Sequence, residues 1–91
     1  MNQEFKDFLI RDMKSCAPED RQEFLRMLKF KPDQVVNVIS ANIIGWGTSF
    51  VMKTGRVLGG YDIKSDIQSD AQELLRAYQE HFAEELGAIN Q

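Results

Sequence analysis

The stretch from Val35 to Met52, VVNVISANIIGWGTSFVM, contains no charged residue, although 27% of the residues in this 91-residue chain are charged. Charged segments flank it, and a stretch that avoids water normally lies in the interior. It is nearly long enough to span a membrane, but asparagine, serine and threonine side chains interrupt it, and asparagine is costly in hydrocarbon. We therefore expect a core element of a soluble protein and no membrane span.

A helix from Pro32 to about Thr54 best explains this stretch. Proline is favoured in the first turn of a helix, and Asp33 suits the positive N-terminal end. Apolar residues then recur at spacings of three and four, at Val35, Val36, Ile39, Ile43, Trp46 and Phe50. The alternative is a break near Gly45, because Gly45 and Gly47 together cost about 2 kcal/mol of helix propensity. A short hairpin over residues 48–58 would then make the fold α+β.

Three amphipathic segments accompany this helix. Residues 3–14 place apolar side chains on one face, a second segment begins at Pro18 and ends near Phe30, and a third runs from Ser65 to Gly87. The third has a continuous apolar stripe, made of Ala71, Leu74, Leu75, Tyr78, Phe82 and Leu86. We expect residues 1–91 to form a single all-α domain, a small four-helix bundle with the uncharged helix packed between the others.

Composition limits the classes of function. A net charge of −3 and an isoelectric point near 5.0 argue against a nucleic-acid binder, which usually carries a basic surface. The single cysteine, Cys16, excludes an internal disulfide and a cysteine-based zinc site. The first residues lack the basic region that opens an export signal, so we expect a cytoplasmic protein. A chain this short buries a modest core, and a partner subunit would stabilise it.

Small residues in the uncharged stretch indicate a candidate contact surface. Ala41, Gly45 and Ser49 are spaced four apart, and small side chains at this spacing allow another backbone to approach closely. Trp46 lies beside them, either as a core aromatic or as an anchor for a partner, since tryptophan is common at the centre of interfaces. We predict a self-association or partner surface at these four residues.

A second candidate site is a basic, glycine-containing loop over residues 53–64. Lys53, Arg56 and Lys64 surround it, and free backbone N–H groups there, together with the N-terminus of the last helix, would suit a phosphate or a carboxylate. The alternative is that these are solvated charges that offset nearby acids.

No pattern in the sequence predicts a catalytic, cofactor or metal site, because nothing brings His81, the single histidine, beside a nucleophile and an acid. We expect a non-enzymatic cytoplasmic interaction or regulatory protein that forms homo-oligomers and binds a protein partner. The alternative is a small binding module for a phosphorylated ligand or nucleic acid, which would use the loop 53–64.

Overall fold

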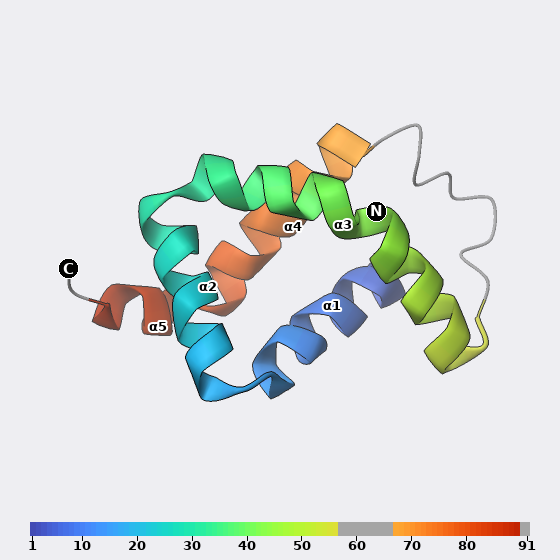
Figure 1. Cartoon of the computed structure of the whole chain (residues 1–91), viewed down its shortest axis with the longest axis horizontal. Coiled ribbons are helices and arrows are strands. Elements are labelled where there is room, and N and C mark those ends of the chain that lie inside the picture. The colour runs from blue at the N-terminus through green and yellow to red at the C-terminus, as the bar shows by residue number, and fades with distance from the viewer. Residues whose placement is uncertain (57–66, 90–91) are drawn as a thin grey trace.

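The computed structural model describes residues 1–56 and 67–89, which form five packed helices (Figure 1). In chain order they are α1 (Gln3–Ser15), α2 (Pro18–Phe30), α3 (Pro32–Thr54), α4 (Ile67–His81) and α5 (Ala83–Ala88). There is no strand within those two ranges. The prediction of an all-α fold is confirmed.

Local sequence signals set the ends of the first three helices. The side-chain oxygen of Asn2 accepts a hydrogen bond from the Phe5 N–H at 3.0 Å, which caps the start of α1. Pro18 and Pro32 occupy the first positions of α2 and α3, where the missing N–H has no cost. Gly55 ends α3 in the left-handed conformation with φ of 70°, and its N–H donates to the Val51 carbonyl at 2.9 Å.

The hairpin alternative is wrong for the part of 48–58 that is described. The helix α3 continues through Gly45 and Gly47 as far as Thr54, and residues 57–58 lie outside the described residues. The length of α3 explains why the helix is not broken. The two glycines cost about 2 kcal/mol of helix propensity, and the packing of a 23-residue helix against its neighbours stabilises it by more than that.

The helix α3 arches across the top of the molecule in Figure 1, with α4 behind it and α1 and α2 below. Its most extensive contacts are with α4, and it also contacts α1 and α2. Aromatic rings join the layers: the Phe50 ring of α3 lies 5.6 Å from that of Phe5 and 5.4 Å from that of Phe8, and Phe24 of α2 meets Tyr78 of α4 edge-on at 5.0 Å.

The last helical segment is broken where the sequence predicted continuity. The backbone of Phe82 leaves helical geometry, with φ of −109° and ψ of 22°, and separates α4 from α5. The Phe82 side chain is nevertheless fully buried. The change of direction brings α5 against α2, where Lys29 Nζ donates to the carbonyl oxygens of Leu86 and Ile89, each at 2.7 Å. These long-range hydrogen bonds hold the C-terminal end of α5.

The expectation that the uncharged stretch is packed between the other helices is wrong for one side of it. Only 33% of the most apolar 18-residue window of α3 is buried. Its buried residues are Val35, Val36, Ile39, Ile43, Gly47 and Phe50, which lie on one side of the helix. The helix therefore contributes one face to the core and leaves the opposite face in water.

Candidate functional site

The exposed side of α3 is a continuous uncharged surface. Spacings of four and three residues place six positions along it, and we call them the α3 outer face: Gln34, Val38, Ala41, Gly45, Thr48 and Met52. All six are exposed. No charged residue occurs between the first and the last of them, so the face differs from an ordinary solvated helix surface.

Apolar side chains on this side of α3 are unusually accessible. Met52 is 81% exposed, Val38 is 45% exposed, and Ile44, which borders the face, is 43% exposed. They are three of the four large apolar side chains that are exposed among the described residues, and the fourth is Phe30 on α2. A single exposed apolar residue needs no explanation, but three on one uncharged side of a helix make that side a candidate contact surface.

The polar residues of this side are partly satisfied within α3 itself. The Asn42 amide donates to the Val38 carbonyl at 2.8 Å, and the Thr48 hydroxyl donates to the Ile44 carbonyl at 3.2 Å. A polar group whose hydrogen bond is already made is less costly to bury than one that still requires water. Burying this side of α3 against a partner therefore costs less free energy than its number of polar residues indicates.

The four predicted contact residues do not share one surface. Ala41 and Gly45 are exposed on the outer face, and Ser49 is half-buried at its edge. Trp46 is half-buried and packs against the hydrophobic core. The structure thus separates the tryptophan from the small residues, because positions 45 and 46 differ by about 100° around a helix.

The basic residues of the second candidate site make contacts with α1. Arg56 donates to both carboxylate oxygens of Glu4, at 2.8 and 3.0 Å, in an exposed ion pair. Lys53 Nζ lies 5.7 Å from the centre of the Phe8 ring, a cation–π distance. Lys64 lies outside the described residues, so the predicted cluster of three cations is not tested as a unit.

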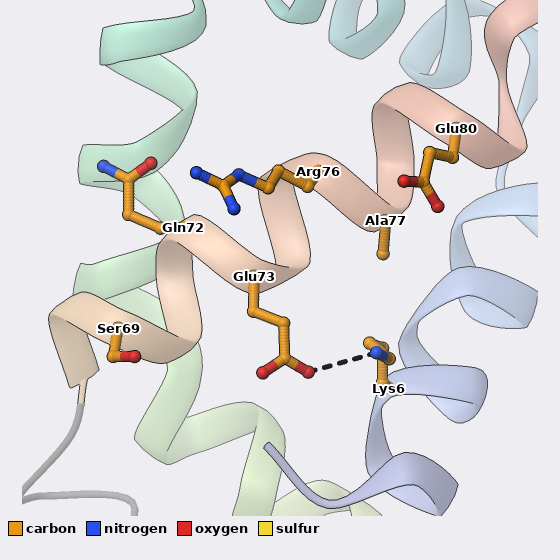
Figure 2. Close-up of a pocket in the computed structure, with 7 residues that line it drawn as sticks. All are labelled: Lys6, Ser69, Gln72, Glu73, Arg76, Ala77 and Glu80. Carbon is orange, nitrogen blue, oxygen red and sulfur yellow. Dashed lines mark hydrogen bonds and ion pairs between the residues drawn. The ribbon is translucent and has the colours of Figure 1, made fainter.

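A groove lined by charged side chains, with a volume of about 560 Å³, lies between α1 and α4 and was not predicted from the sequence (Figure 2). Lys6 Nζ of α1 and Glu73 Oε2 of α4 are 3.1 Å apart across it, while Arg76 points away from this pair. The residues that line the groove are Lys6, Ser69, Gln72, Glu73, Arg76, Ala77 and Glu80. The two cations among them balance the charge of the two acids. The groove therefore has no excess charge with which to attract an ionic ligand.

The Lys6–Glu73 pair belongs to a larger ionic cluster that joins the start of the chain to α4. The α-ammonium group of Met1 lies 3.2 Å from Glu73 Oε1 and 3.4 Å from Asp70 Oδ1, and Asp70 is only 3% exposed. Burial has the largest single effect on the Glu73 pKa and raises it, but the hydrogen bonds and positive charges of Lys6 and Met1 together lower that pKa below its ordinary value of 4.5. The cluster explains how α1 is fixed on α4.

No protein-family model, curated protein or solved structure matches this chain.

Proposed function

We propose that this chain is a non-enzymatic interaction protein that self-associates through the α3 outer face. The observation that carries the proposal is an exposed, uncharged helix surface in a chain where 27% of the residues are charged. The opposite side of α3 already packs against α1, α2 and α4. The side of a helix opposite the core usually carries charged and polar residues, so a second side without any charge favours a contact there.

Gly45 supports the proposal through an energetic argument. A Cβ atom added at this position would meet nothing within 4 Å, so the fold of the single chain does not require a glycine there. Glycine in an exposed helix interior is nevertheless about 1 kcal/mol less favourable than alanine. A glycine at this position therefore lowers the stability of the helix in the isolated chain and is not needed for its packing. It would, however, allow the backbone of another helix to approach closely, as small residues do in packed helices.

A protein surface accounts for the outer face better than a lipid surface does. The helix α3 is long and apolar enough to cross a bilayer, with a mean hydropathy of 1.4 over its best window. A helix that lies in a membrane interface, however, usually carries Lys and Arg along its polar side and large apolar residues on the other. The outer face carries no Lys or Arg, and its apolar Val38 and Met52 are separated by small and uncharged polar residues.

The test is the substitution Gly45→Leu, with the molar mass measured by light scattering. Measurements run from about 1 μM to 1 mM, where association free energies lie between about −8 and −4 kcal/mol. The wild-type mass should rise above that of one chain within this range. The substitution should raise the dissociation constant by about 5- to 150-fold, because overpacking of a close contact costs about 1–3 kcal/mol.

Gly87→Leu is the matched control. Gly87 is also exposed, also helical and also has nothing within 4 Å of an added Cβ, but it lies in α5, away from the outer face. It should leave the association unchanged, and circular dichroism should show that both variants remain helical. A wild-type chain that stays monomeric up to 1 mM would refute the proposal, as would equal effects of the two substitutions.

A further inference from the structure

The α3 outer face is symmetric along its length. Its six residues form three pairs at equal distances from the level of Ile43: Ala41 with Gly45, Val38 with Thr48, and Gln34 with Met52. Reversing the direction of the helix therefore exchanges small residues with small, medium-sized with medium-sized and long with long. In an antiparallel pair of helices whose twofold axis passes at this level, each of these side chains meets one of similar size, so the face can pack against a second copy of itself.

The sizes of the side chains assign the closest contact to the centre of this face, because small residues let two backbones approach each other. The midpoint lies between Ala41 and Gly45, the two smallest side chains of the face. The longer Gln34 and Met52 lie at the two ends of the face.

The charges at the two ends of α3 select the direction. Asp33 in the first turn and Lys53 in the last turn are both exposed and have opposite signs. Two parallel copies would place Asp33 near Asp33 at one end and Lys53 near Lys53 at the other. Two antiparallel copies place opposite charges at both ends and also align the helix dipoles favourably, and electrostatic complementarity of this kind sets the register of an interface.

We propose, resting on the self-association proposed above, that the partner is a second copy of this chain whose α3 crosses the first in an antiparallel direction. The twofold axis passes at the level of Ile43, and the backbones approach most closely between Ala41 and Gly45. Val38 of each copy faces Thr48 of the other. The assembly is closed, because one outer face covers one other, so association stops at the dimer.

Pulsed electron paramagnetic resonance between spin labels tests the direction. Gln34→Cys and Met52→Cys are prepared separately in a Cys16→Ser background, so that each chain carries one label at an exposed site. Antiparallel helices should separate the two backbones at position 34 by about 27 Å, which is 18 residues at a rise of about 1.5 Å each. Position 52 should give the same separation. Adding Gly45→Leu should weaken the distance signal from both.

The possible results distinguish the direction of the helices from self-association itself and from lipid binding. Separations near the interhelical distance of about 8–10 Å at both positions would indicate parallel helices and overturn the antiparallel arrangement, while leaving self-association intact. A monomeric mass in light scattering would refute self-association itself. If vesicles of anionic phospholipid sediment the wild-type chain but not Gly45→Glu, and no dimer forms, lipid rather than a second copy covers the outer face, and both proposals are wrong.

Discussion

Alanine substitutions at two glycines of α3 should change the stability of the monomer in opposite directions. Gly45 lies in the middle of the helix, whereas Gly55 ends it in the left-handed conformation with φ of 70°. A new Cβ meets nothing within 4 Å at either position. Packing is therefore the same in the two cases, and only the backbone conformation differs.

The magnitudes follow from that difference. Gly45→Ala should raise the free energy of unfolding by about 1 kcal/mol, the difference between alanine and glycine in a helix interior. Gly55→Ala should lower it by about 1 kcal/mol, because an L-residue in the left-handed region costs about 1–2 kcal/mol and the reduced entropy of the unfolded chain offsets part of this cost. For a domain of this size each change shifts the melting temperature by about 4–8 °C.

Urea denaturation followed by circular dichroism measures both changes, at a concentration where light scattering gives the mass of one chain. The slopes of free energy against urea should agree among wild type and variants, since a constant slope shows that the same surface is exposed on unfolding. An unchanged or lower stability for Gly45→Ala would refute the reasoning. It would mean that α3 is not a continuous exposed helix at Gly45, and the argument for the outer face would lose its energetic basis.

Two further predictions concern contacts between distant parts of the chain. The pKa of Glu73 is lowered in the folded state, so the ionised side chain adds to the free energy of unfolding. This contribution is about 0.5 kcal/mol after solvent screening. It is present above pH 4.5 and is lost as the pH falls through the folded pKa. Glu73→Gln and Lys6→Met should each flatten the stability curve in that acid range, as measured by thermal melts from pH 2 to 6, and a curve that keeps its acid slope would contradict this. Lys29→Met removes both hydrogen bonds to α5 and should increase amide hydrogen exchange there severalfold, while exchange in α4 stays unchanged.

The helix boundaries were largely predictable because they depend on local signals. Pro18 and Pro32 mark the first turns of α2 and α3, and Gly55 ends α3, each for a reason that concerns only nearby backbone. The apolar spacing in residues 35–50 predicted the side of α3 that is buried. The break at Phe82 was not predictable in this way, since Phe82 continues the apolar stripe and its backbone is turned by the packing of α5 against α2.

The candidate surface was predictable only in part. The small residues Ala41 and Gly45 were identified from their spacing, but their exposure and the separation of Trp46 from them depend on which side of α3 the other helices cover. The burial of Asp70 and the Lys6–Glu73 pair likewise had no signal in the sequence. The Lys6–Glu73 pair and the contact of Met1 with Asp70 join residues more than sixty positions apart, and no local sequence pattern predicts such a contact.

The sequence by itself determined that this chain is helical, where three of its helices begin and end, and that one of them carries no charge along 18 residues. Those properties arise from backbone preferences and hydrophobic spacing, which act within a few residues. The tertiary structure alone decided that α3 is covered on one side only. The number of neighbours that a helix has depends on how the remaining helices divide the apolar surface among themselves, and that division is a property of the whole fold.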